Sequence, residues 1–427
     1  MKQLSHPNLS KHSTGTAVIT LLLAGAFMVK LVRACGVDRI LTDFNGFGYT
    51  EMLINYEGGF VRRGLFGQLL WEVCAATGLS PFSIVITVCT ASFVAVAAFF
   101  VRRFRREGFS TWFLLSPLCY SCVEFIIRKD YLCYLLVLAI FGLLGGKSRT
   151  APRFALVTAL SLLGLFLHEA FLFFGVPLAA LFMLSDKRLR RTGVAFVLLT
   201  LAAFCTLCLY KGNGQTAYAI IESWNTLLPA RQHLVFMEDN SIGALTWNTL
   251  ETMKFHLRTN FHGYDSFRYL GLFLQPAFAL CAYYFAINFP FVVNCRNTSD
   301  TTGRQTRLSL LLIFSAVCLL PMFTVLSCDY PRLYQYTLVA AFGAFLLLPA
   351  ERIDAMFPRK LHTAVRNFNR RMNAAVVPTR GLLTGLLFVL ALPGCGFDLP
   401  PAFLLSVAGT WLNGAVLLLK NLFLTLI

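Results

Sequence analysis

The sequence predicts an all-α protein, a polytopic bundle of about 12 membrane-spanning helices, with 10 to 13 as the range. Hydrophobic residues make up 57% of the 427 residues, and the mean hydropathy is +0.67. Apolar runs long enough to cross a bilayer recur along nearly the whole chain, and charged residues gather between them. Hydrocarbon cannot satisfy backbone N–H and C=O groups, so such runs fold as helices.

The charge content excludes other classes of protein. Water-soluble domains carry roughly 25% charged residues, whereas this chain has 13%. The net charge of +17 comes from short basic clusters between apolar runs rather than from one continuous basic face. We therefore expect the lipid bilayer, and no nucleic acid, as a partner.

Lys and Arg concentrate in cytoplasmic loops, so the basic clusters orient the helices. Both termini are then cytoplasmic, and a bacterial inner membrane is the expected location. The first apolar run has no small-x-small cleavage site after it, so we interpret it as a retained span rather than a secretory signal. The expected spans cover residues 16–34, 82–101, 109–127, 131–146, 154–168, 170–185, 193–210, 268–290, 308–327, 333–349, 381–394 and 402–419.

Residues 1–427 are treated as one integral membrane domain with three notable segments. Two large extracytoplasmic loops are expected at 36–81, which includes an interfacial helix, and at 211–267. A basic cytoplasmic segment at 350–380 is typical of a helix on an anionic membrane surface. The two halves of 154–185 are short, so one tilted span, two spans and a re-entrant hairpin all stay open.

Arg62 and Arg63 form the strongest candidate site. Gly58, Gly64 and Gly67 lie around them on a segment that is expected at the membrane surface. Two adjacent guanidinium groups suit a diphosphate, because arginine binds phosphate through two parallel hydrogen bonds and keeps its charge. A lipid-headgroup anchor is the plainer alternative.

Three further polar clusters are predicted on the same outer face. Arg128, Lys129 and Asp130 fit either a phosphate contact or a solvated turn. An ionisable pair at membrane depth, such as His168 and Glu169, points to function, with a structural pair as the alternative. The last cluster combines Asp329 and Arg332, which are three residues apart and could simply pair with each other.

The second large loop is rich in aromatic residues and carboxylates. Trp224 and Trp247 lie near Glu238 and Asp239 in sequence. Aromatic platforms beside carboxylates suit sugars, whose ring faces are apolar and whose edges carry hydroxyl groups. An interfacial aromatic belt has the same composition, so both interpretations stay open.

The order of these segments resembles the multi-span glycosyltransferases of the GT-C type. The outer turns also look like those of bacterial envelope-polysaccharide membrane proteins, including O-antigen polymerase-like ones, and the segment that carries this likeness is Tyr56-Glu57-Gly58-Gly59-Phe60-Val61-Arg62-Arg63-Gly64-Leu65. The resemblance implies a sugar donor on polyprenyl phosphate and an acidic base in the first outer loop. Asp43 would hold that place, although the usual Asp-x-Asp pair is missing.

The functional hypothesis is transfer of a sugar or oligosaccharide from a polyprenyl-(di)phosphate-linked donor at the extracytoplasmic face. Asp43, Glu57, Glu169 and His168 are the catalytic candidates, since a carboxylate must deprotonate the acceptor hydroxyl. The arginines would hold the phosphate. The alternatives are a transporter or flippase of lipid-linked glycans and an O-acyltransferase that uses His168 as base. No cofactor is expected, with a divalent metal ion as an open alternative.

Overall fold

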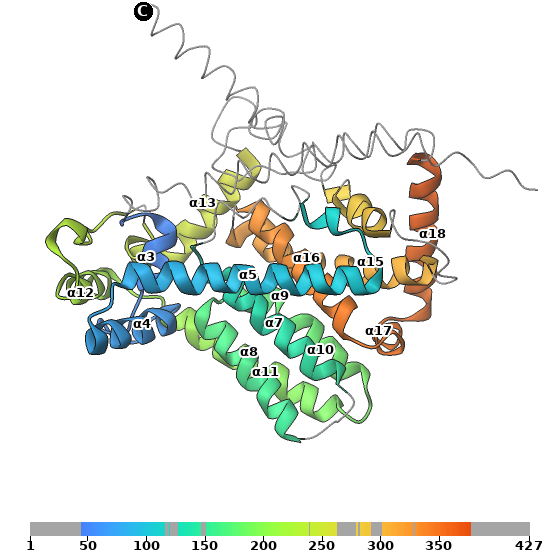
Figure 1. Cartoon of the computed structure of the whole chain (residues 1–427), viewed down its shortest axis with the longest axis horizontal. Helices are drawn as coiled ribbons and strands as arrows, with labels where there is room; N and C mark the ends of the chain where they lie inside the picture. The colour runs from blue at the N-terminus through green and yellow to red at the C-terminus, as the bar shows by residue number, and fades with distance from the viewer. Residues whose placement is uncertain are drawn as a thin grey trace, which may run out of the picture.

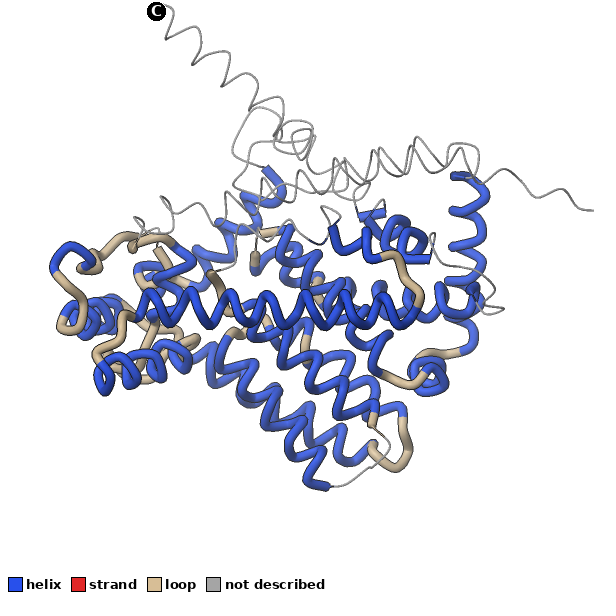
Figure 2. The backbone as a smooth tube through the Cα atoms, viewed as in Figure 1, coloured by secondary structure: helices blue, strands red, loops and turns tan. Residues whose placement is uncertain are grey.

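The computed structural model describes residues 44–115, 119, 127–146, 151–238, 240–262, 279–280, 282–291, 301–327 and 329–376. These residues form helices joined by turns and loops, and no strand occurs among them (Figure 2). The predicted all-α class is therefore confirmed for this part of the chain. The expected spans at 16–34, 381–394 and 402–419 lie outside the described residues, as do most of 109–127 and half of 268–290.

Two described helices are long and apolar enough to cross a membrane. They are α5 (Pro81–Glu107) and α11 (Arg190–Leu209). At 1.5 Å per residue, the 27 residues of α5 extend about 40 Å, which exceeds a hydrocarbon core of about 30 Å. Pro81 begins α5, and Gly108 ends it in the left-handed conformation that glycine adopts without strain.

Shorter apolar helices complete the body. They are α7 (Asp130–Gly145), α8 (Ala151–Leu167), α9 (Phe171–Phe174), α10 (Val176–Ser185), α15 (Thr301–Cys318) and α16 (Tyr330–Leu347). Helix α7 packs against α5, α8 and α16, while α11 packs against α8 and α10 (Figure 1). The helix breaks at His168–Ala170, so the 154–185 region forms separate helices on either side of this turn.

The two predicted outer loops pack together at one end of α5 (Figure 1). The first contributes α3 (Phe47–Leu53) and α4 (Gly64–Thr77), and the second contributes α12 (Gly214–Asn225) and α13 (Thr249–His262). Asn213 caps α12 by accepting the Thr216 N–H at 2.9 Å. Trp224 is buried and donates from Nε1 to the Leu53 carbonyl at 2.6 Å.

The basic 350–380 segment lies at the other end of α5. It forms α17 (Ala350–Met356) and α18 (Arg359–Val376), which runs across the direction of α5 in Figure 1. Asn369 attaches α18 to the body, because it donates to Ser309 Oγ and accepts from the Tyr283 hydroxyl. The basic side chains of α18 at Arg359, Lys360 and Arg366 are exposed.

Candidate functional site

The turns that carry the predicted polar clusters meet near the end of α5 that holds α3 and α4. Arg62 and Arg63 precede α4, Lys129 and Asp130 begin α7, and His168 and Glu169 lie between α8 and α9. We call the whole assembly the charged network, and it consists of Glu51, Arg62, Arg63, Arg128, Lys129, Asp130, His168, Glu169, Asp329, Arg332 and Tyr336.

Arg63 lies between two carboxylates from different segments. Its Nε donates to both oxygens of Glu169, at 3.0 and 2.8 Å, and its Nη2 donates to Oε1 of the same residue. Its Nη1 donates to Glu51 Oε1 at 3.2 Å. These bonds join α3, the start of α4 and the turn after α8. The predicted cation Arg63 is therefore occupied by carboxylates of its own chain.

The backbone at Arg63 is unusual. Its φ is 64°, the one positive value among non-glycine residues in the described part of the chain. This left-handed conformation is uncommon for a residue with a side chain, and such strain gathers at functional sites. Lys129 holds the same residue from below, since its Nζ donates to the Arg63 carbonyl at 2.6 Å. The side-chain and backbone contacts together fix the position of this guanidinium.

A second ionic pair joins α7 to α16. Arg332 donates from Nε and Nη2 to the two oxygens of Asp130, each at 2.8 Å. The Tyr336 hydroxyl donates to Asp130 Oδ1 at 2.5 Å. Asp329 lies 3.4 Å from Arg332 and 3.8 Å from Arg128. The local Asp329–Arg332 pairing that sequence spacing suggested is thus present, but the shorter contacts of Arg332 go to Asp130.

His168 connects the two ionic pairs. Its Nδ1 accepts the backbone N–H of Ala170 at 3.1 Å, which places the proton of a neutral imidazole on Nε2. That nitrogen lies 3.4 Å from Glu51 Oε1 and 3.5 Å from Arg332 Nη2. Both ring nitrogens are therefore engaged within the protein. This arrangement suits an orienting residue better than a base that takes a proton from a substrate.

Arg62 is the most accessible cation of the network. Its side chain is 32% exposed, against 21% for Arg63 and 12% for Arg332. Its nearest carboxylate contact, to Glu169 Oε1, is 3.6 Å long. The Arg62 Nε has no hydrogen-bond partner among the described residues. An anion that approaches the network therefore meets Arg62 first.

The network is buried and nearly neutral. Five cations face four carboxylates, which leaves one net positive charge while His168 is neutral. Burial alone raises the pKa of Glu51, but the charge of Arg63 outweighs it, so this pKa falls to about 2. The same opposition holds the pKa of Glu169 well below its usual range. Burial lowers the pKa of Lys129 to about 8.

Two predicted catalytic residues do not join the network. Glu57 is exposed, and its carboxylate accepts a hydrogen bond from Gln68 Nε2 at 3.0 Å. Asp43 lies outside the described residues. The buried ring of Trp224 also cannot serve as a sugar platform, because it packs inside the outer end and its N–H is bonded.

Sequence reasoning missed two members of the network. Glu51 stands in the first outer loop but was not selected as a site residue, and it is 1% exposed with no partner for its Oε2 among the described residues. Tyr336 lies one helical turn after Arg332, so it shares the same face of α16. A buried carboxylate in a short helix and an i, i+4 tyrosine were the available signals.

Comparisons of the chain with protein-family models, with curated proteins and with solved structures gave no match. The functional argument therefore depends on the geometry of the chain itself. Within the described ranges, no group of three or more His, Cys, Asp and Glu side chains is arranged to hold a metal ion.

Proposed function

We propose that this chain is a polytopic membrane protein, with about 12 spans, that transfers a sugar or oligosaccharide from a polyprenyl-(di)phosphate-linked donor at the outer face of a bacterial inner membrane. One observation carries the proposal. Nine charged side chains from five separate segments converge near one end of the helical body, with net positive charge and an accessible arginine at the rim. Buried charges gathered at membrane depth point to function.

In this proposal Arg62 binds the phosphate and Arg63 supports it. A phosphate offers charged oxygens that arginine binds through parallel hydrogen bonds. Arg62 can turn to a phosphate because its only printed ionic contact is the long one to Glu169. Arg63 stays in place between Glu169 and Glu51, so it adds positive potential without having to move. The phosphate is then the leaving group that this potential stabilises.

The transfer breaks the bond between the anomeric carbon and the phosphate oxygen and forms a bond to an acceptor hydroxyl oxygen. The hydroxyl proton goes to a carboxylate, and Glu169 is the accessible candidate of the network at 17% exposure. Two arginines lower its pKa in the free protein. When phosphate takes over Arg62, Glu169 loses one of these charges and becomes more basic. Substrate binding would thereby prepare the base.

The test is transfer by the purified protein. Arg62→Ala should reduce lengthening of a lipid-linked oligosaccharide at least tenfold at equal protein abundance. Arg231→Ala is the matched control, because Arg231 is an exposed arginine in the second outer loop. Unchanged product in Arg62→Ala, or equal losses in both variants, would contradict the assigned role of Arg62.

The topology has its own test. Reporter fusions after Asp130 and Glu169 should report the outer side, and fusions after Arg106 and Arg366 the cytoplasmic side. An inner location for Glu169 would remove the support for an outward-facing site, because Glu169 and Arg63 are bonded to each other.

A second candidate function, transport of lipid-linked glycans, is favoured by one observation. Each of the four network carboxylates already contacts a cation, so none is held as a ready base. Binding and release of an anionic lipid need no base. Purified protein in vesicles separates the two functions, since a transferase lengthens the glycan and a flippase only moves it across the bilayer.

A further inference from the structure

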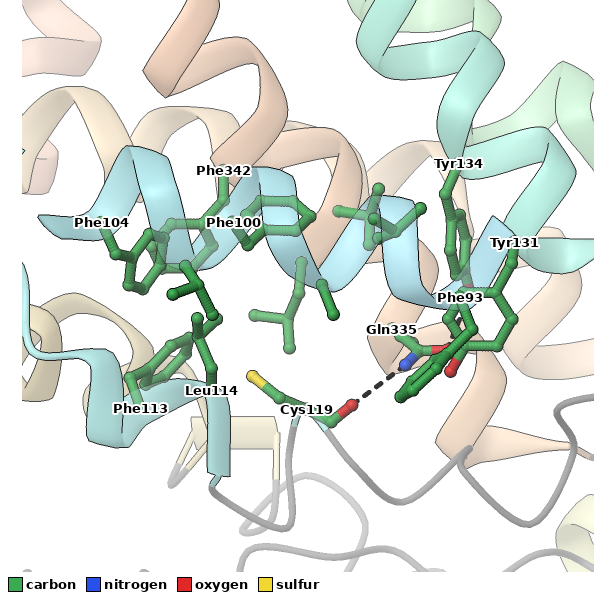
Figure 3. A pocket seen from close by; sticks show the side chains of 15 residues that line it. Phe93, Phe100, Phe104, Phe113, Leu114, Cys119, Tyr131, Tyr134, Gln335 and Phe342 are labelled. Atoms are coloured by element: carbon green, nitrogen blue, oxygen red, sulfur yellow. Dashed lines mark hydrogen bonds between the residues drawn. The ribbon is translucent and has the colours of Figure 1, made fainter. Parts of the chain in front are cut away.

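An apolar cavity of about 290 Å³ lies among α5, α7, α16 and the short helix η1 (Thr111–Leu115). Its wall is largely aromatic, and Figure 3 shows the rings gathered around it. The α5 part of the wall runs from Phe93 to Phe104. Eleven residues of helix correspond to about 16 Å, so the cavity follows α5 for much of a bilayer leaflet.

The two ends of the cavity differ in chemistry. Phe104, Phe113 and Phe342 surround one end, whereas Tyr131, Tyr134 and Gln335 stand at the other, as Figure 3 shows. The Tyr134 hydroxyl donates to Gln335 Oε1 at 3.0 Å, and the Gln335 amide donates to the Cys119 carbonyl at 3.0 Å. The space between the two ends is lined by carbon, which favours a hydrocarbon occupant.

The polar end of the cavity adjoins the charged network. Tyr131 directly follows Asp130, and Gln335 lies three residues after Arg332 on α16. The ring of Tyr134 lies 5.9 Å from the ring of Tyr336, whose hydroxyl donates to Asp130. An amphiphile with an anionic head at the network therefore has an apolar space of matching direction beside it.

We propose that this cavity holds the part of an isoprenoid chain nearest the phosphate, with the phosphate at the charged network and the chain directed toward Phe104. The inference rests on the proposed function and adds the subsite for the lipid. Charge complementarity supports this occupant, because the network is net positive and an isoprenoid phosphate joins an anion to a hydrocarbon. The flat faces of the rings suit the planar double bonds of such a chain.

The experiment compares two probes on the full-length protein in detergent. Inorganic diphosphate reports the head site alone, and farnesyl diphosphate reports the head and the chain. Farnesyl diphosphate should bind the wild type at least tenfold more tightly than inorganic diphosphate. Ala97→Trp fills the cavity from α5 and should remove this gain, while Ala98→Trp, one residue on and exposed, should keep it. Val101→Phe is a second filling variant.

The outcomes separate this inference from the proposed function. Failure of wild type to bind either probe would overturn the phosphate site and the proposed function with it. Equal affinity for both probes, or a gain that survives in folded Ala97→Trp and Val101→Phe, would overturn the cavity assignment alone. Dioleoyl phosphatidic acid that competes as well as farnesyl diphosphate would overturn the choice of an isoprenoid chain over an acyl chain. Retained binding of inorganic diphosphate shows that a variant is folded.

Discussion

Removing the charge of Asp130 should unfold the network from within. Asp130 accepts two bonds from Arg332 at 2.8 Å and one from the Tyr336 hydroxyl, and its side chain is 5% exposed. Asp130→Asn keeps the side-chain volume, so no cavity contributes to the effect. The new amide turns two N–H donors toward the guanidinium of Arg332. The main consequence is a buried cation without its carboxylate.

The expected loss follows from the burial. Breaking one partner of a buried ion pair costs about 3–5 kcal/mol, against about 0–1 kcal/mol for an exposed pair. Asp329 stays 3.4 Å from Arg332 and compensates part of the charge. We therefore expect a loss of about 3 kcal/mol for Asp130→Asn.

The assay is reversible unfolding in mixed micelles, with Asp354→Asn as the matched control. Asp354 also pairs with an arginine, Arg307 at 3.1 Å, but its side chain is 44% exposed. Its loss should stay below about 1 kcal/mol. Equal effects of the two substitutions would refute the reasoning, because the Asp130–Arg332 pair would then behave as a surface pair.

Two further predictions follow from packing and charge. Gly67→Ala should destabilise the protein by about 1–3 kcal/mol or more, because its Cβ would lie 2.0 Å from the Ile54 carbonyl oxygen. Gly142→Ala, where a Cβ meets nothing within 4 Å, should instead stabilise the protein by about 0.5–1 kcal/mol, and equal unfolding midpoints would contradict this contrast. Burial lowers the pKa of Lys129 from 10.5 to about 8, so between these values the unfolded chain binds more protons and stability rises with pH. Lys129→Met should lose that rise between pH 8 and 10 in thermal unfolding, and an unchanged slope would disprove it.

The helices were largely predictable because hydrophobic length is a strong signal. The expected spans at 82–101, 131–146 and 193–210 fall on α5, α7 and α11. The break at His168 was also visible, since a charged pair interrupts an apolar stretch. The bounds of the described helices differ by a few residues because caps such as Gly108 and polar first turns extend them.

The partners of the charged residues were less predictable. The sequence indicates that Arg63 and Glu169 share a face, but their bonding depends on the positive φ of Arg63 and on how α4 approaches α8. Glu51 and Glu57 look alike in sequence, yet one is 1% exposed and the other lies on the surface. Tertiary packing decided between them, and no local pattern reports it.

The most direct test of the central claim is whether the charged network recognises phosphate. The measurement is binding of a polyprenyl diphosphate and of the uncharged polyprenol of the same length to wild type and Arg62→Ala in lipid nanodiscs. Charged hydrogen bonds contribute about 1.5–3 kcal/mol, so wild type should prefer the diphosphate by more than tenfold. Arg62→Ala should lose most of this preference and bind the polyprenol unchanged. Equal affinity of wild type for the two lipids would contradict the account.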